Sequence, residues 1–476
     1  MTDRPIPPVA KVEPLSHEQL GRRRTDDYAW MKDDNWREVL RDPSAIKRDV
    51  KNHLEAENAY AKAMLAPTEA LQAAMFQEMK GRIKEDDSSA PTPDGPWEYY
   101  VRYEPGAQHP VHARRPRGSS DGEQALLDAD AEARGKAFFQ VVGAEHSPDH
   151  ALYAYAVDEQ GSEVCRIYVK DLATGELLPE PVESGAGDFV FSPCSQWLFW
   201  IWRDADGRPA KLYRRPARGS DDTLVYEEED DGFFMGVSVT ASRAYIALGL
   251  GNQETSEARL IPACDPTLDP FVVEPRTEGL RYEVEHWADA GGKSHFVIRT
   301  NADGAVDFKL VLANEADPSR RTWRDLVPHE PGRFIVGLTA FRGHLARLER
   351  VNANNRIVIT EAGTLAEHAI DFDEEAYALG LEGGYEYDTP SLRFVYQSPT
   401  TPRQWFDYDM TTRRRTLRKT QEIPSGHDPA AYVTRRLYAP ASDGAQVPIT
   451  VLMKAGTPLD GSAPLLLYGY GSYGAA

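Results

Sequence analysis

The spacing of apolar residues changes once along the chain, near Pro91. Before that point, from Asp42 to Ile83, apolar residues recur every three to four positions, which is the period of an amphipathic helix. Asp42 can cap a first helix that ends at Pro67, and Thr68 can cap a second. The apolar stripes of these two predicted helices are Ile46, Val50, Leu54, Ala61 and Leu65 in the first, and Leu71, Met75 and Met79 in the second.

After Pro91 the period falls to two, which is typical of strands. The clearest segment runs from Phe138 to Val182 and divides into four strand-like pieces separated by turns such as Ser147–Asp149. The same pattern then starts again at once. This region therefore consists of repeated four-stranded units.

When the units are aligned on their second strands, seven copies are found along the chain. Alignment on the third strands also gives seven copies. Units of four short strands, repeated every 40 to 50 residues or so, are typical of a β-propeller, in which each sheet buries its faces against its neighbours. A β-sandwich would not keep so regular a period. The second strands begin near Trp97, Leu152, Trp197, Tyr245, His295, Leu345 and Leu392.

The repeats end near Glu422. Residues Tyr432 to Gly456 predict a long hairpin with Asp443 and Gly444 at its tip. Ala463 to Leu467 is fully apolar, as in strands that are buried on both faces of an α/β sheet. We therefore predict a mainly β protein in which a helical N-terminal arm (1–83) and a seven-bladed propeller (84–422) precede the first strands of an α/β domain (423–476).

Composition narrows the function classes. The 476 residues carry a formal net charge of -21, which argues against binding to nucleic acid or to anionic membranes. No apolar run approaches the roughly 18 residues of a membrane span, and the N-terminus shows no secretion signal. Three cysteines give neither a disulfide framework nor zinc spacing. We expect a soluble, cytoplasmic protein.

Short motifs give no complete catalytic set. Gly469, Gly471 and Gly474 spell GxGxxG, but the helix and the acidic residue that a dinucleotide site requires do not follow. A GxSxG at 118–122 lies in a polar turn without a preceding buried strand. The close pairs His109/His112 and His146/His150 stand beside prolines, where no helix would align them as ligands. We expect neither a metal nor a cofactor.

The two ends of the chain resemble one known family. The arm carries RRRTDDYAW at 22–30, and the chain ends in LLLYGYGSYGA. Together with the seven-fold propeller and the Asp-Gly hairpin, these motifs resemble the prolyl oligopeptidase family of serine peptidases. The YGYGSYGA ending and the SPD and DLATGELLP turns are more similar to oligopeptidase B than to the prolyl-specific members.

The resemblance implies an α/β-hydrolase domain built from the arm and the C-terminal part, with a propeller that admits only short peptides. It implies cleavage after Arg or Lys by a Ser-His-Asp triad. Tyr470 matches the position whose hydroxyl completes the oxyanion hole, and Tyr473 matches an aromatic residue of the S1 pocket.

This sequence departs from the family pattern at one point, because the nucleophile, aspartate and histidine would all follow Ala476. We therefore expect this chain to be the N-terminal part of a serine oligopeptidase, inactive alone, with short basic peptides and the missing C-terminal hydrolase half as partners. The alternative is a non-catalytic propeller that serves as an interaction module.

Overall fold

The computed structural model describes residues 4–288 and 291–471. The chain divides into two compact units: 1–84 with the short segments 159–162 and 423–425, and the rest. No helix within the described ranges has the length and apolar character needed to cross a membrane.

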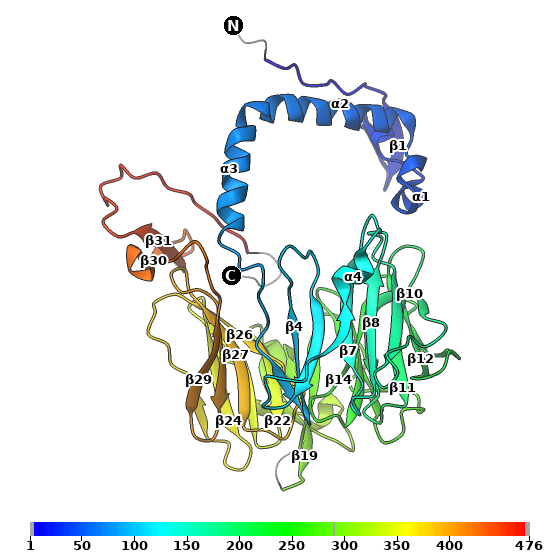
Figure 1. Ribbon diagram of the computed structural model, residues 1–476, viewed down its shortest axis with the longest axis vertical. Helices are drawn as coiled ribbons and strands as arrows, with labels where there is room; N and C mark the ends of the chain where they lie inside the picture. The colour runs from blue at the N-terminus through cyan, green and yellow to red at the C-terminus, as the bar shows by residue number, and fades with distance from the viewer. Residues whose placement is uncertain (1–3, 289–290, 472–476) are drawn as a thin grey trace. The chain divides into compact units, whose positions relative to one another are not determined.

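The first unit is mainly helical (Figure 1). It begins with a hairpin that the sequence pattern did not predict, and three helices follow. Its elements are β1 (Leu15–Gln19), β2 (Arg22–Asp26), α1 (Trp36–Arg41), α2 (Arg48–Leu65) and α3 (Glu69–Lys80).

The predicted start of the first long helix is wrong. The carboxylate of Asp42 accepts a hydrogen bond from the backbone N–H of Ser44, so it caps the short 3-10 helix Pro43–Ala45. The chain then turns again, and α2 begins only at Arg48. The break near Pro67 is confirmed, since α2 ends at Leu65.

The apolar stripe of α3 remains open to solvent. Leu71, Met75 and Met79 are 60, 49 and 53% exposed. An amphipathic helix is stabilised mainly by burial of such a stripe against other elements.

The second unit is a β-propeller. Five of its sheets have four antiparallel strands in chain order. Their strands are β3 (Thr92–Asp94), β4 (Trp97–Arg102), β5 (Val111–Pro116) and β6 (Gln124–Asp128); β14 (Phe234–Val239), β15 (Tyr245–Gly251), β16 (Ser256–Pro262) and β17 (Phe271–Val272); β18 (Tyr282–Ala288), β19 (Ser294–Thr300), β20 (Lys309–Asn314) and β21 (Arg324–Val327); β22 (Arg333–Phe341), β23 (His344–Val351), β24 (Asn354–Glu361) and β25 (Glu367–Ala369); and β26 (Ala378–Glu382), β27 (Ser391–Gln397), β28 (Gln404–Asp409) and β29 (Arg414–Thr420).

A sixth sheet has seven strands and takes the place of two predicted units. Its strands are β7 (Gln140–His146), β8 (Leu152–Asp158), β9 (Cys165–Asp171), β10 (Val182–Phe191), β11 (Trp197–Arg203), β12 (Pro209–Pro216) and β13 (Thr223–Glu227).

The prediction of seven separate four-stranded blades is therefore wrong: five are separate, and β10 joins the strands of the other two units. The first part of β10 pairs with β9 and its second part pairs with β11, with a register shift after Gly185. Gly187 has φ +102, and a Cβ there would lie 2.6 Å from Val142 Cγ1. One long strand that bends at glycines can thus serve both units.

The core consists of apolar clusters between neighbouring sheets. On β19, Phe296 and Ile298 pack into a cluster with Leu260 of the preceding sheet. Val297, between them, packs into a cluster with Leu345 of the following sheet. Because side chains alternate along a strand, each sheet contributes to two interfaces, and each large apolar side chain that is fully buried stabilises the fold by roughly 1.5–3 kcal/mol.

The last sheet meets the first through polar contacts. Arg393 on β27 is buried and donates from Nη1 to the backbone oxygens of Ala90 and Pro91, at 3.2 and 2.8 Å. Lys419 on β29 forms an ion pair with Asp87 at 2.7 Å. These contacts close the ring.

The C-terminal part of the second unit is a hairpin of β30 (Tyr432–Pro440) and β31 (Gln446–Lys454), with Asp443 and Gly444 between the strands as predicted. The expected strand Ala463–Leu467 is not formed, and Leu465, Leu466 and Leu467 are 83 to 89% exposed. A central strand requires hydrogen-bonded neighbours on both sides, and the described residues supply none there. Among residues 423–471, which the structure describes, the hairpin is the one part of the expected α/β domain that is formed, so the assignment of 423–476 to such a domain stays a prediction.

We expect Arg393→Ala to lower the free energy of unfolding of the propeller by about 3 kcal/mol, because the backbone oxygens of Ala90 and Pro91 lose their cationic donor and Asp407 is left with its more exposed partner Arg418. Calorimetric unfolding of the intact protein measures this. The control Arg321→Ala removes an exposed arginine that pairs with Asp317 four residues earlier, and we expect a change below about 0.5 kcal/mol. Equal effects of the two substitutions would contradict this account of ring closure.

Candidate functional site

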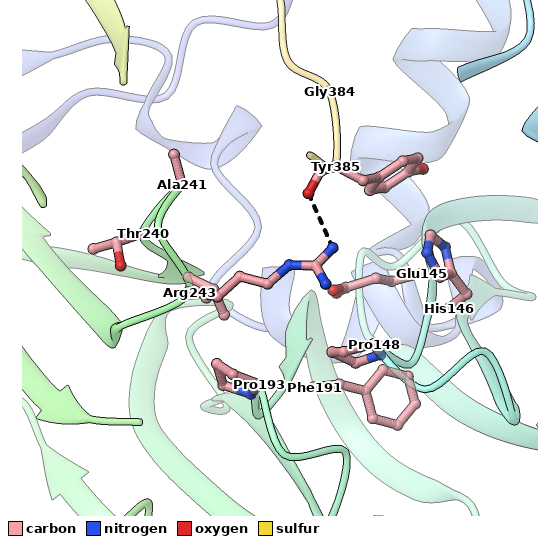
Figure 2. A pocket seen from close by; sticks show the side chains of 11 residues that line it. Glu145, His146, Pro148, Phe191, Pro193, Thr240, Ala241, Arg243, Gly384 and Tyr385 are labelled. Carbon is pink, nitrogen blue, oxygen red and sulfur yellow. Dashed lines mark hydrogen bonds between the residues drawn. The ribbon is translucent and has the colours of Figure 1, made fainter. Parts of the chain in front are cut away.

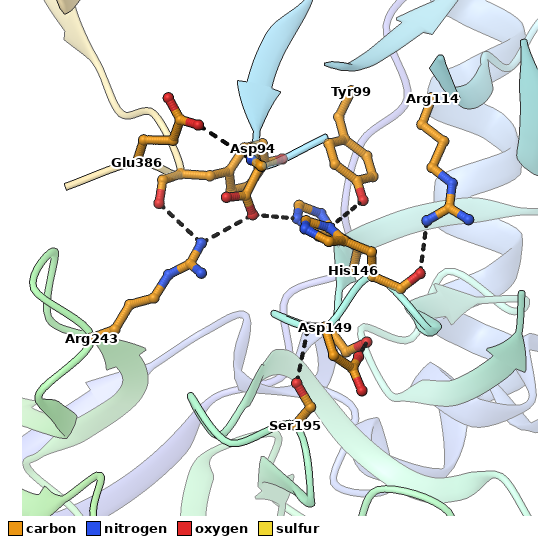
Figure 3. A network of polar contacts seen from close by, with 12 residues as sticks. Asp94, Tyr99, Arg114, His146, Asp149, Ser195, Arg243 and Glu386 are labelled. Carbon is orange, nitrogen blue, oxygen red and sulfur yellow. Dashed lines mark hydrogen bonds and ion pairs between the residues drawn. The ribbon is translucent and has the colours of Figure 1, made fainter. Parts of the chain in front are cut away.

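Polar residues that lie far apart in the sequence meet at one end of the propeller channel. The first strand of each propeller sheet lines the channel. Asp94 ends β3 and His146 ends β7, while Arg243 follows β14 and Tyr385 follows β26. Figure 3 shows His146 and Arg243 bound to Asp94, and Figure 2 shows the bond from Arg243 to Tyr385. The site therefore forms only when the ring is assembled.

Asp94 lies at the centre of this group. Its Oδ2 accepts a hydrogen bond from His146 Nε2 at 2.9 Å and another from Arg243 Nη2 at 3.0 Å. Burial by itself would raise the pKa of the Asp94 carboxyl, but the hydrogen bond from His146 and the Arg243 guanidinium outweigh it and hold that pKa below its usual value. Asp94 is thus a carboxylate at neutral pH.

His146 is held between aromatic rings. Its ring stacks on Tyr99 with centroids 3.7 Å apart and meets the edge of Tyr385 at 4.6 Å. Burial lowers the pKa of His146, although Asp94 opposes this shift. The neutral imidazole therefore donates its Nε2 proton to Asp94.

Glu145, next to His146 on β7, lines a small pocket (Figure 2). The pocket has a volume of about 150 Å³, and Phe191, Thr240 and Arg243 also line it. Burial raises the pKa of Glu145 to about 8, while Arg243 opposes this shift. The Glu145 side chain therefore holds a proton at neutral pH and can donate a hydrogen bond into the pocket.

A larger pocket of about 500 Å³ adjoins the first and shares Glu145, His146 and Tyr385 with it. It lies between the β3–β6 sheet and β7–β8, and Tyr99, His112 and Tyr153 line it. This volume falls in the usual range for pockets that bind small organic groups.

Asp94, His146 and His150 place possible metal-ligating atoms within 4.8 Å of one another. The Arg243 guanidinium already places a positive charge beside the Asp94 carboxylate. His150 Nδ1 forms a hydrogen bond of 2.8 Å with the Tyr99 hydroxyl. The two histidine rings are nearly parallel, at 16°, with centroids 5.5 Å apart, so their in-plane lone pairs do not converge. These contacts disfavour a cation, and the absence of a metal stays a prediction.

A serine, a histidine and a glutamate also lie in a row at the β14–β15 turn. Ser242 Oγ is 2.8 Å from His286 Nδ1, and His286 Nε2 is 3.4 Å from Glu315 Oε1. Ser242 Oγ also accepts from the backbone N–H of Ala244 in its own turn, and His286 is buried. We interpret this group as turn stabilisation, because a nucleophile must face a space that admits substrate.

The site residues predicted from sequence lie elsewhere. Tyr470 is 61% exposed, in an irregular segment after β31, and Tyr473 lies outside the described residues. Sequence reasoning identified the pair His146 and His150 but not Asp94, Arg243 or Tyr385. Each of these residues lies at or just after the end of the first strand of its repeat unit, and this shared position is the one sequence signal that could have grouped them.

The comparisons with known proteins agree on one family. Residues 7–421 match the family described as prolyl oligopeptidase, N-terminal beta-propeller domain. The chain is 36% identical to dipeptidyl aminopeptidase BI of Pseudoxanthomonas mexicana, over 99% of this chain and 65% of that protein. It is 30% identical to protease 2 of Moraxella lacunata, over 98% of this chain and 66% of that protein.

A solved structure of oligopeptidase B from Leishmania major superposes with a TM-score of 0.89 at 28% identity, covering 99% of this chain and 68% of that one. The chain thus spans about 65% of the length of the curated relatives it matches.

We expect the stability of the intact protein to fall as the pH rises from about 4.5 to about 8, because the folded state holds the Glu145 proton over this range and the unfolded state releases it. Glu145→Gln removes this loss. The variant should be more stable than the parent by about 1–2 kcal/mol above pH 8 and equal to it near pH 4.5, an effect reduced by partial contact with solvent.

Thermal unfolding across this pH range measures the difference. The control is Glu132→Gln at an exposed position of α4 (Ala129–Ala133). If both variants follow the pH profile of the parent, Glu145 is not protonated in the folded state.

Proposed function

We propose that this chain, which belongs to the prolyl oligopeptidase family of peptidases, is the N-terminal part of a serine oligopeptidase that cuts short peptides after Arg or Lys. The observation that carries the proposal is the match of residues 7–421 to the family's propeller domain. The YGYGSYGA ending and the likeness to protease 2 and oligopeptidase B support the preference for basic residues. The net charge of -21 would favour cationic peptides.

In this proposal the arm (1–83) and the segment 423–476 belong to a hydrolase domain whose remainder follows Ala476. Two exposed apolar surfaces support this division: the stripe Leu71, Met75 and Met79 on α3, and Leu465–Leu467 after β31. Apolar surfaces of this kind are stabilised by burial. The remaining third of the relatives' length would supply the partner that buries them.

The chemistry would be divided between the two parts. A downstream serine would attack the peptide carbonyl, and a downstream histidine would take its proton. The Tyr470 hydroxyl would donate a hydrogen bond to the resulting oxyanion, and Tyr473 would line the pocket for the basic side chain. The propeller (84–422) would restrict access to short peptides. This chain alone would be inactive because it lacks nucleophile and base.

We expect the intact protein to release the leaving group from N-terminally blocked arginyl and lysyl amides, and the isolated chain to release none. Hydrolysis assays with purified protein measure this. Because one relative is named a dipeptidyl aminopeptidase, a dipeptidyl amide with a free amino group is assayed beside the blocked substrates.

Cleavage of only the unblocked substrate would replace the proposed specificity by that of a dipeptidyl aminopeptidase. No cleavage of either, by an intact protein that ends at Ala476, would favour a non-catalytic propeller.

We expect Tyr470→Phe to lower kcat of the intact enzyme by about 10²- to 10³-fold with little change in KM, because the lost hydroxyl would stabilise charge only in the transition state. The matched control is Tyr468→Phe, two residues earlier in the same exposed segment. Steady-state kinetics on a blocked arginyl amide measure both variants. An unchanged kcat for Tyr470→Phe would remove Tyr470 from the oxyanion hole.

A further inference from the structure

Arg243 makes contacts with two sheets other than its own. It lies in the turn between β14 and β15, with a left-handed backbone of φ +59. Its Nη2 donates to Asp94 Oδ2, in the β3–β6 sheet, and to the backbone oxygen of Tyr385, next to the β26–β29 sheet, each at 3.0 Å. One guanidinium nitrogen therefore joins three sheets.

The order of the sheets around the ring shows that this side chain crosses the channel. Apolar clusters join the β14–β17 sheet to β10–β12 before it and to the β18–β21 sheet after it. The first and last sheets are neighbours of each other through Arg393 and Lys419. Arg243 thus starts from a sheet that adjoins neither of its acceptors. Figure 3 shows it extending from its turn toward Asp94 and the segment that carries Glu386.

The space left beside Arg243 is small. The pocket that it lines has a volume of about 150 Å³. A pocket of about 500 Å³ adjoins it and shares Glu145, His146 and Tyr385, but Arg243 does not line that larger pocket.

The C-terminal hairpin contacts the opposite end of the channel. The backbone N–H of Arg436 on β30 donates to Glu375, which precedes β26, at 2.8 Å, and the Arg436 side chain donates to Asn354 at the start of β24. In an antiparallel sheet, the start of a first or third strand lies opposite the end of a first strand. Arg243 and the hairpin are therefore at opposite ends.

We propose that Arg243, bound to Asp94 and to the Tyr385 carbonyl, closes its end of the channel to peptides, so that substrate enters the enzyme without passing that end. We call these three residues the Arg243 bridge. The statement about peptides rests on the proposed peptidase function, whereas the tie between sheets does not.

The test uses Arg243→Met in the intact protein. The matched control is Arg259→Met, which removes a half-buried arginine of the same sheet whose ion pair with Glu257 lies within one strand. Hydrogen–deuterium exchange is measured in segments 92–97 and 383–388. We expect exchange to rise about tenfold or more in both segments for Arg243→Met, since the lost hydrogen bonds involve charged groups, and in neither for the control.

The second readout is the ratio of kcat/KM for a long arginyl peptide to that for a short blocked arginyl amide. This ratio should rise for Arg243→Met and stay constant for Arg259→Met. Arg243→Lys keeps the charge and can reach one acceptor, so its effects should be smaller, and it replaces Arg243→Met if that variant does not fold.

Each result decides one statement. Unchanged exchange in both segments overturns the Arg243 bridge. Raised exchange with an unchanged ratio supports the tie between sheets but overturns closure against peptides. If the parent protein does not cleave the short amide, the proposed peptidase function fails, and exchange alone decides the bridge.

Discussion

Each propeller sheet has two faces to bury, and this constraint determines most of the structure. Adjacent residues of β19 show it directly, since Phe296 packs toward one neighbouring sheet and Val297 toward the other. A sheet with two apolar faces is stable only between two others, so the first and last sheets must also meet. In this chain they meet through the charges of Arg393 and Lys419, which are desolvated at some cost and so require well-placed partners.

The repeating strands could be predicted because the alternation of apolar and polar residues that marks a strand is visible within a short window of sequence. The second strands begin at Trp97, Leu152, Trp197 and Tyr245 as predicted, and the other three begin one residue before the predicted position. The number of separate sheets could not be predicted in this way, because β10 carries pairing partners on both sides and nothing in its composition marks where one sheet passes into the next. The strand expected at Ala463–Leu467 failed for a different reason: an apolar pattern becomes a strand only beside hydrogen-bonded neighbours, and the described residues supply none there.

The polar site at the channel end could be predicted only in part. The pair His146 and His150 is visible as a short spacing, whereas Asp94 and Arg243 are separated by 149 positions. Their contact depends on how the ring closes and on the length of an arginine side chain, and neither is a property of a sequence window. The charge states also follow from the assembly. Asp94 stays ionised because His146 and Arg243 both donate to it, while Glu145 on β7 keeps its proton because burial raises its pKa.

Several charged side chains cross the joint between the last and first sheets, and the Arg243 bridge is attached to both of its sides. Asp94 belongs to the first sheet and Tyr385 follows a strand of the last, so separation of these sheets would break at least one of the two hydrogen bonds of Arg243 Nη2. Glu386 adds a direct tie across the same joint, by its ion pair with Arg117 at 2.6 Å. An opening of the ring at this joint and an opening of the channel end are therefore coupled, because both require the acceptors of one guanidinium to move apart.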